Sequence, residues 1–167
     1  MEFILILLCI LVVNQNCYKM RKSIILSLFV LILLPFIGHS VSNDGDKILG
    51  KWVVGSGKAH ILIYKYGEKY AGKIAWLKEP LNEKGQPKMD KNNPDASKHT
   101  NPLLGNVNML GFEYDGDNTW DDGTIYDSEN GKTYSCTMKL KDDNTLDVRG
   151  YIGISMIGRT DTWKRVK

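Results

Sequence analysis

Short segments that alternate apolar and polar residues make up the chain after residue 45, and they predict β-strands. β-branched and aromatic residues dominate these segments, and no amphipathic helical period of any length appears among them. Gly, Asn and Asp separate the segments, which is typical of an antiparallel meander. The pattern predicts about eight strands, at residues 51–54, 59–66, 69–77, 107–114, 119–126, 132–140, 145–151 and 155–166.

Most connections between these segments are short and have explicit turn chemistry. Residues that tolerate positive φ, or that hydrogen-bond to their own backbone, stand at Gly67, 115–118, 130–131 and 142–144. Tight turns place consecutive strands side by side in an up-and-down, antiparallel arrangement. Eight such strands hide both sheet edges by closing. The fold class that we predict is therefore all-β, an eight-stranded antiparallel up-and-down barrel, in preference to an open sandwich.

One connection is much longer than the others. Residues 78–105 are rich in Pro, Asn, Lys and Asp and show no period. Loops beyond about 12–15 residues are uncommon in compact domains and are often functional. We therefore interpret this loop as a lid or rim of a binding site, with a tolerated surface insertion as the alternative.

The two ends of the domain carry residues that fit a closed barrel. The first strand of such a barrel pairs antiparallel with the last, so Trp52 near the start of one faces Arg165 at the end of the other. An Arg across the Trp ring combines aromatic burial with a cation-π contact of about 0.5–2 kcal/mol. Arg159 would lie roughly 20 Å further along the strand and is the poorer candidate.

These residues also carry a family resemblance. Gly50-Lys51-Trp52 resembles the Gly-x-Trp signature of the lipocalin and fatty-acid-binding (calycin) group, in which a late Arg packs over the Trp. Nearly all of residues 46–166 is similar to a bacterial family of exported proteins known as domain of unknown function 2147. The similar stretches are "ILGKW", "GKI" at 72–74, Asp90 and "NNP" of "DKNNP", "PLLG", "WDDGTIYDSENGKTY" and "LDVRGYIGISMIGRTDTWKRV". The resemblance implies a calycin-like barrel and no established activity.

The first 42 residues have the composition of a targeting segment. A positively charged region at Arg21 and Lys22 follows Met20. An apolar stretch comes next, at residues 24–37, and residues 40 and 42 have the small side chains of a cleavage site. The apolar stretch has 14 residues, whereas a membrane-spanning helix needs about 20. We therefore predict a signal peptide region at 1–42, with Met20 as the true start, and a single barrel domain at 43–167; a membrane anchor is the alternative. The exported domain would be periplasmic or secreted, without a stable membrane anchor after processing.

Charge and cysteine content narrow the partners of the mature domain. The 167-residue chain has a formal net charge of +3, and the leader carries +2 of it. The mature domain keeps a net charge of +1 and has no concentrated basic patch, so nothing supports nucleic acid or an anionic membrane surface as its partner. A protein partner is not specified. Only Cys136 remains after processing, and its alternation with Tyr134 and Met138 predicts a small buried hydrophobic residue.

No motif in the mature chain predicts catalysis, a cofactor or a metal. His60 lies within a predicted strand and His99 in the long loop, and no ligand spacing links them. "DGDNTWDDG" and "DKNNPD" depart from the calcium-loop pattern at required positions, so we interpret both as turns. A nucleophile elbow, a phosphate-binding Gly-rich loop and a dinucleotide fingerprint are all missing. An enzyme is therefore the less favoured interpretation, and we predict no catalytic residues and no cofactor.

Aromatic and charged residues on the predicted strands are the candidates for ligand binding. A small barrel either fills its interior with such side chains or leaves a cavity for one small ligand. Arg149 and Tyr151 point the same way, and an inward Arg would need an anionic partner, either Asp90, Asp122 or Asp127 or a ligand head group. The candidate ligand-binding residues are Tyr64, Asp90, Trp120, Arg149 and Tyr151.

Three functional hypotheses follow from the sequence. The leading one is an exported barrel that binds a small apolar or amphiphilic molecule, with residues 78–105 as lid or rim. The second is a structural or interaction protein of the cell envelope with a solid barrel and without enzymatic activity. The third is a hydrolase-like enzyme that uses Asp90 or His99 from the long loop.

Overall fold

The computed structural model describes residues 44–167, which form one compact unit. The predicted signal peptide and the start at Met20 lie outside the described residues. Residues 44–167 include two short 3-10 helices, η1 (Asp44–Ile48) and η2 (Ala96–Lys98). Within residues 44–167, no helix has the length and apolar character needed to cross a membrane.

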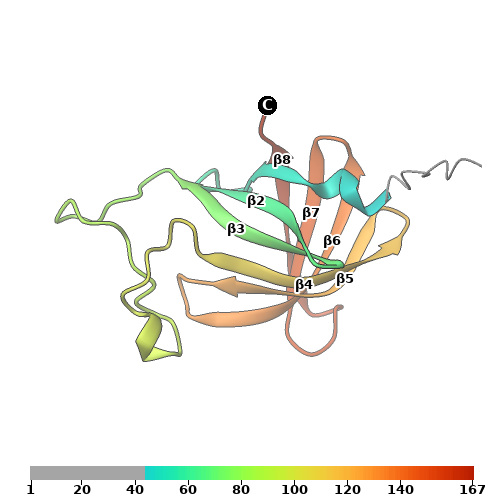
Figure 1. The fold of residues 1–167 in the computed structure, drawn as a ribbon. Helices are drawn as coiled ribbons and strands as arrows, with labels where there is room; N and C mark the ends of the chain where they lie inside the picture. Colours follow the sequence, from blue (N-terminus) through green and yellow to red (C-terminus); the bar gives the residue numbers. More distant parts are fainter. Residues whose placement is uncertain (1–43) are drawn as a thin grey trace, which may run out of the picture. The chain divides into compact units, whose positions relative to one another are not determined.

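Eight strands form where the alternation predicts them (Figure 1). They are β1 (Gly50–Val53), β2 (Ala59–Tyr66), β3 (Lys69–Leu77), β4 (Val107–Gly116), β5 (Thr119–Asp127), β6 (Lys132–Asp142), β7 (Thr145–Tyr151) and β8 (Gly158–Arg165). The largest difference from the prediction is at the start of β8. Residues 155–157 belong to the preceding loop, because Arg149 binds the carbonyl oxygens of Ser155 and Met156 there.

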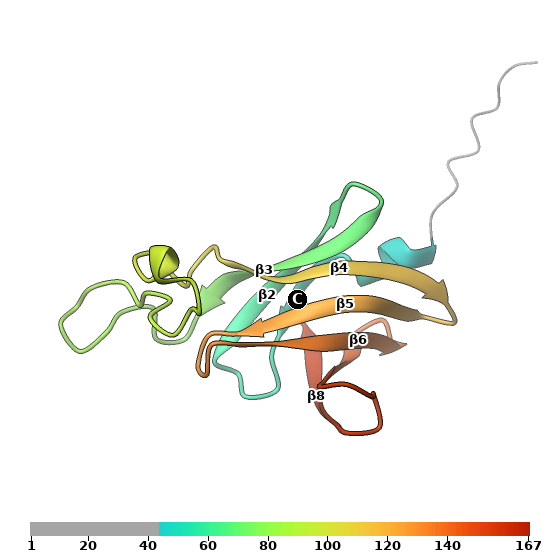
Figure 2. The ribbon, with the colours of Figure 1, turned by 90° about the horizontal axis from the view of Figure 1, so that it is seen from below.

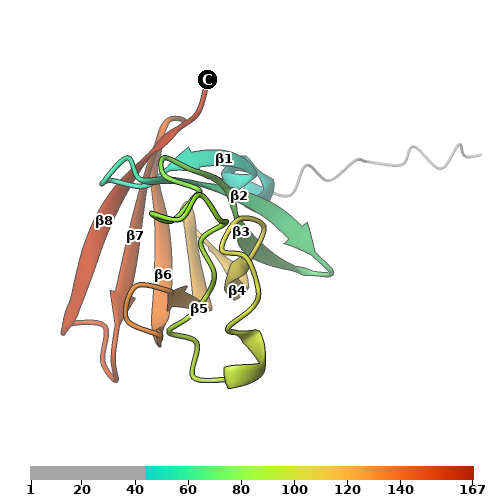
Figure 3. The same cartoon turned by 90° about the vertical axis from the view of Figure 1, so that its left-hand side faces the viewer.

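The strands close into a barrel in the order β1 to β8, and every neighbouring pair is antiparallel (Figures 1, 2 and 3). Closure depends on a short ladder between β1 and β8, in which Trp52 pairs with Arg165 and Val53 with Lys164. This confirms the predicted up-and-down barrel. Four loops lie at one end, here called the open end: residues 54–58, 78–106, 128–131 and 152–157.

The other end, here called the closed end, is plugged by large side chains and by η1. Trp52 is fully buried, and its indole N–H donates a hydrogen bond of 2.9 Å to the carbonyl of Ile48. The guanidinium carbon of Arg165 lies 4.2 Å from the centroid of the Trp52 ring, which confirms the predicted contact. Arg165 also donates to the carbonyls of Leu49 and Lys47, both at 2.7 Å. One side chain therefore connects the plug, the last strand and the segment that enters the first strand.

A glycine is required where Arg165 approaches β1. Gly50 has φ of +124°, a conformation that L side chains rarely adopt. A Cβ atom added there would lie 3.0 Å from Nη1 of Arg165. The Gly-Lys-Trp sequence thus combines a backbone conformation that favours glycine with the aromatic plug two residues later.

The closed end is also held by a polar contact to η1. The hydroxyl of Tyr70, a buried residue, donates a hydrogen bond of 2.8 Å to Asp46, and Lys65 forms an ion pair of 3.1 Å with the same carboxylate. These two partners hold the pKa of Asp46 below its usual range, with the Tyr70 hydrogen bond as the larger cause. The carboxylate stays charged and keeps η1 fixed to β2 and β3.

Candidate functional site

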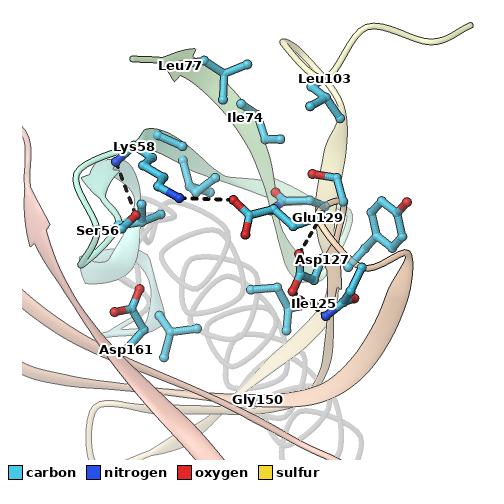
Figure 4. Close-up of a pocket in the computed structure, with 18 of the residues that line it drawn as sticks. Ser56, Lys58, Ile74, Leu77, Leu103, Ile125, Asp127, Glu129, Gly150 and Asp161 are labelled. Carbon is cyan, nitrogen blue, oxygen red and sulfur yellow. Dashed lines mark hydrogen bonds and ion pairs between the residues drawn. The ribbon is translucent and has the colours of Figure 1, made fainter. Parts of the chain in front are cut away.

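A cavity of about 890 Å³ opens at the end of the barrel opposite the Trp52 plug (Figure 4). Five strands contribute apolar side chains to its wall, because their inward positions near the open end hold aliphatic or aromatic residues. These side chains include Ile61 on β2, Ile74 and Leu77 on β3, Ile125 on β5, Val148 on β7 and Trp163 on β8. The barrel is therefore solid at one end and hollow at the other.

Charged residues surround the mouth of this cavity. Lys58 from the β1–β2 loop and Glu129 from the β5–β6 loop reach toward each other and form an ion pair of 3.5 Å (Figure 4). Both side chains are more than two thirds exposed, so the pair contributes little stability. Arg159 and Asp161 of β8 also line the cavity. A molecule that enters therefore passes a polar rim before it reaches apolar walls.

Asp161 fixes part of that rim to the barrel. Its carboxylate accepts hydrogen bonds from the backbone N–H of Gly55 at 3.0 Å and from the indole N–H of Trp163 at 2.8 Å. The first bond holds the β1–β2 loop against β8, beyond the two residue pairs that close the barrel. The second orients the Trp163 ring, which lines the cavity.

Among residues 44–167, one buried polar atom of the cavity wall has no hydrogen-bond partner. The side-chain oxygen of Asn108 on β4 is buried and accepts no hydrogen bond within the described part of the chain. A buried amide oxygen without a donor costs about 1–3 kcal/mol. A ligand that offers a hydroxyl or N–H group at this point would remove that cost, so Asn108 is a candidate specificity residue.

The long loop forms one side of the site and is anchored there by Asp90. Asp90 is almost fully buried and accepts hydrogen bonds from Asn93 at 2.7 Å, Asn106 at 3.2 Å and the Tyr126 hydroxyl at 2.6 Å. Tyr126 lines the cavity from β5, while Leu103 and others line it from the loop. Burial, and then the hydrogen bond to Asp90, raise the pKa of Tyr126 to about 12. The loop is thus a fixed wall that Asp90 joins to the barrel.

A second attachment joins this loop to the β5–β6 loop. The Asn92 side-chain amide donates to the carbonyls of Ser128 and Glu129, both at 3.0 Å. The backbone there approaches so closely that a Cβ atom on Gly131 would lie 2.0 Å from the Asn92 carbonyl oxygen. Glycine at position 131, with φ of +70°, therefore allows the two loops to meet beside the mouth.

The five candidate ligand-binding residues are not brought together. Tyr64 shares the outer-face parity of β2, since Ile61 and Ile63 are the buried positions, and Lys73 lies 5.7 Å from its ring. Trp120 is fully buried, with its ring centroid 5.1 Å from that of Tyr114. Neither these two nor Asp90, Arg149 and Tyr151 line the cavity, and a ligand-binding role for any of the five stays a prediction.

Arg149 points away from the barrel interior, which corrects the idea of an inward Arg. Leu146 and Val148 are the buried residues of β7, so Arg149 occupies the outer parity. Its guanidinium donates to the carbonyls of Ser155 at 2.9 Å and Met156 at 3.3 Å and to the Thr160 hydroxyl at 3.0 Å. Backbone carbonyls of the β7–β8 loop thus take the place of the carboxylate partner that an inward Arg would need.

The remaining candidates for chemistry are engaged elsewhere. The His60 ring stacks on Trp76 with 4.3 Å between centroids, and Nε2 of His99 lies 2.7 Å from the Asn93 carbonyl oxygen. Neither histidine lines the cavity. Cys136 is fully buried, as predicted, and burial raises the pKa of its thiol to about 12. It therefore packs as a small hydrophobic side chain.

Comparisons with known proteins agree with this architecture. A family model described as an uncharacterized protein conserved in bacteria (DUF2147) matches residues 50–165. Among solved structures, the chain is similar to a Helicobacter pylori protein that is described as belonging to the lipocalin family. The two share 20% identity and a TM-score of 0.62, over 71% of this chain and 82% of that one, so the likeness shows the fold alone. No curated protein matches the chain.

Proposed function

We propose that this chain, which belongs to the DUF2147 family of uncharacterized bacterial proteins, binds a small, partly apolar molecule at the open end of its barrel. The cavity carries the proposal. Its volume of about 890 Å³ lies within the range of roughly 300–1,000 Å³ that is typical of ligand pockets. The lipocalin-like fold of the chain is compatible with such a role.

The distribution of polar groups supports an amphiphilic ligand. The apolar part would lie against Ile61, Ile74 and Val148, where burial of apolar surface contributes about 25 cal/mol per Å². A hydroxyl or N–H group would pair with the side-chain oxygen of Asn108. A charged or strongly polar end would remain at the mouth, where the rim has side chains of both signs.

The site of action belongs to the same proposal. An export signal at residues 1–42 would deliver the barrel to the periplasm or the exterior. There the protein would act as a carrier or a store for its ligand. Measurement of the mass of the protein isolated from its bacterial envelope, with and without denaturation, tests both parts. A chain that retains residues 1–42 would contradict the export proposal.

Native mass spectrometry of that protein is also the primary test of binding. A discrete excess mass that disappears on denaturation is the expected result and identifies the ligand class. A matched pair of variants then places the ligand. Gly150 lines the cavity, and a Cβ atom there would lie at ordinary contact distance, 3.7 Å, from its nearest neighbours, so Gly150→Leu places a side chain in the cavity. Thr124→Leu adds an apolar side chain at an exposed position of strand β5.

The fluorescent probe N-phenyl-1-naphthylamine gives a direct readout for these variants. We expect Gly150→Leu to weaken probe binding by at least about tenfold, which corresponds to roughly 1.4 kcal/mol, and Thr124→Leu to leave it unchanged. Equal binding by the two variants would contradict ligand binding in the cavity.

One observation favours the second hypothesis, an interaction protein of the cell envelope. Four apolar residues of the β7–β8 loop are more than half exposed: Ile152, Ile154, Met156 and Ile157. The hollow open end, in contrast, does not fit the solid barrel that this hypothesis assumed. An external contact and an internal ligand are therefore compatible in one molecule.

A further inference from the structure

The β7–β8 loop presents a concentrated apolar surface to solvent. Ile152, Ile154, Met156 and Ile157 are 67%, 60%, 85% and 71% exposed, and only Gly153 and Ser155 separate them. Single exposed apolar residues are normal on soluble proteins, whereas a contiguous group marks an interaction site. These four residues are called the apolar tip below.

Hydrogen bonds hold the apolar tip in its outward position. Arg149 binds the carbonyls of Ser155 and Met156 from the outer face of β7. Within the loop, the N–H of Ile157 donates to the carbonyl of Ile154 at 3.1 Å. The loop therefore has a defined conformation that displays its side chains, and Figures 1 and 3 show it extending beyond the ends of β7 and β8.

The two charged residues nearest to the apolar tip in the sequence are positive. Arg149 precedes it and Arg159 follows it, and the chain contains no carboxylate from residue 148 to residue 160. Glu129, an acidic residue of another open-end loop, is paired with Lys58. Tyr151 stands between Arg149 and the tip. A loop with apolar side chains at its tip and Tyr and Arg side chains at its base fits the boundary between lipid tails and anionic headgroups.

We propose that the apolar tip inserts into the surface of an anionic lipid bilayer and docks the barrel there reversibly. A convex loop of flexible aliphatic side chains suits the lipid interface, whereas a protein hot spot is typically an aromatic or Arg anchor that fills a pocket. Charge alone does not predict an anionic membrane surface as a partner, because the chain has no concentrated basic patch. The exposed apolar tip is the new observation, so apolar insertion provides most of the affinity and the two arginines add to it.

Docking in this manner would bring the cavity to the membrane. Gly150 and Arg159 form a residue pair between β7 and β8, and both line the cavity. The next pair, Tyr151 and Gly158, is the last before the apolar tip begins. The mouth would then face the lipid surface, where amphiphilic molecules concentrate. The docking itself does not depend on a ligand in the cavity.

The test measures binding of residues 43–167, which contain the whole barrel unit, to lipid vesicles by co-sedimentation. Vesicles of equimolar phosphatidylglycerol and phosphatidylcholine provide an anionic surface, and pure phosphatidylcholine provides a neutral one. We expect the double variant Ile154→Asp/Ile157→Asp to lower partitioning into the anionic vesicles by at least about tenfold. The matched control is Tyr66→Asp, at the β2–β3 turn of the closed end, where the side chain is 68% exposed.

A labelled variant tells insertion from simple adsorption. Cys136 is buried, so Met156→Cys gives the only accessible thiol among the described residues and takes an environment-sensitive fluorophore. A blue shift on addition of anionic vesicles, weaker with neutral ones, would support insertion of the tip. The emission of the same fluorophore at the closed end, attached to Tyr66→Cys, should not shift.

Three results would overturn the proposal. They are no binding of the unmodified barrel to anionic vesicles, equal binding by the Ile154→Asp/Ile157→Asp and Tyr66→Asp variants, and a Met156→Cys label that does not respond. Sedimentation velocity tests the alternative that the apolar tip binds a second copy of this chain. That alternative would replace the proposal if the unmodified barrel forms a dimer and the Ile154→Asp/Ile157→Asp variant does not.

Discussion

At the closed end of the barrel, Trp52 is covered by Arg165 and η1, and both Trp52 and Ile48 of η1 are fully buried. At the open end, the inward positions surround a cavity, and the covering loops carry charged and exposed apolar residues. The same eight strands thus have a packed end and a hollow end.

The difference separates stability from recognition along the barrel axis. Contacts at the closed end join the first and last strands, so they determine whether the barrel closes at all. Contacts at the open end join loops to one another and to single strands, and they leave space between the strands. Substitutions should therefore have large effects on stability at one end and on binding at the other.

The largest expected effect comes from Trp52→Ala. Removal of a fully buried Trp leaves a cavity and removes the ring that Arg165 covers, so we expect a loss of about 3–5 kcal/mol in the free energy of unfolding. Urea denaturation measures it. Trp76→Ala is the control, because that side chain is 42% exposed and stacks on His60 outside the core. A loss below about 1 kcal/mol for Trp52→Ala would contradict its role as the plug.

Two glycines allow the same comparison for the backbone. Gly50→Ala at the closed end places a Cβ atom near Arg165 in a conformation with φ of +124°, so we expect a loss of about 2–3 kcal/mol. Gly57→Ala at the open end has φ of +68° and no atom within 4 Å of the added Cβ, so the loss should be about 1 kcal/mol. Thermal denaturation of the two variants tests this order. Equal losses would mean that contact with Arg165 is unimportant.

The sequence predicts the closed end well because local patterns and pairing rules determine it. The strand alternation and turn residues predict the barrel, and closure then brings Trp52 opposite Arg165 by register alone. The resemblance to the DUF2147 family rests on stretches along nearly all of residues 46–166 and is confirmed by the match over residues 50–165.

The open end is harder to predict because its walls come from strands that are distant in sequence. Asn108 lies on β4, where bulges and the positive φ of Gly111 disturb the alternation that tells inside from outside. The outward direction of Arg149, in contrast, could have been predicted from the sequence. Apolar Leu146 and Val148 alternate with polar Asp147 and Arg149, and this pattern already indicates an outward Arg. The partners of Asp90 depend on the fold of the long loop, which has no period to interpret.

A smaller effect should appear at alkaline pH. The pKa of Tyr126 is raised to about 12, so the folded protein holds the phenol proton more tightly than the unfolded chain does. The stability that this provides is complete below pH about 10 and is lost as pH rises toward 12. Tyr126→Phe should therefore lose less stability than the parent protein over this pH interval. The exposed Tyr66→Phe is the control, and denaturation at several pH values is the measurement.

The smallest expected effect on stability concerns the ion pair across the mouth. Lys58→Met breaks the pair with Glu129, and because both side chains are exposed the free energy of unfolding should change by less than about 1 kcal/mol. Release of N-phenyl-1-naphthylamine from the cavity should become faster, since a contact that spans the entrance is lost. Lys139→Met removes another exposed ion pair, with Asp117 at the closed end, and should leave release unchanged. In high salt, which screens exposed charges, the Lys58→Met and parent release rates should converge. Release that is equally fast in both variants would show that the probe does not leave by way of this mouth.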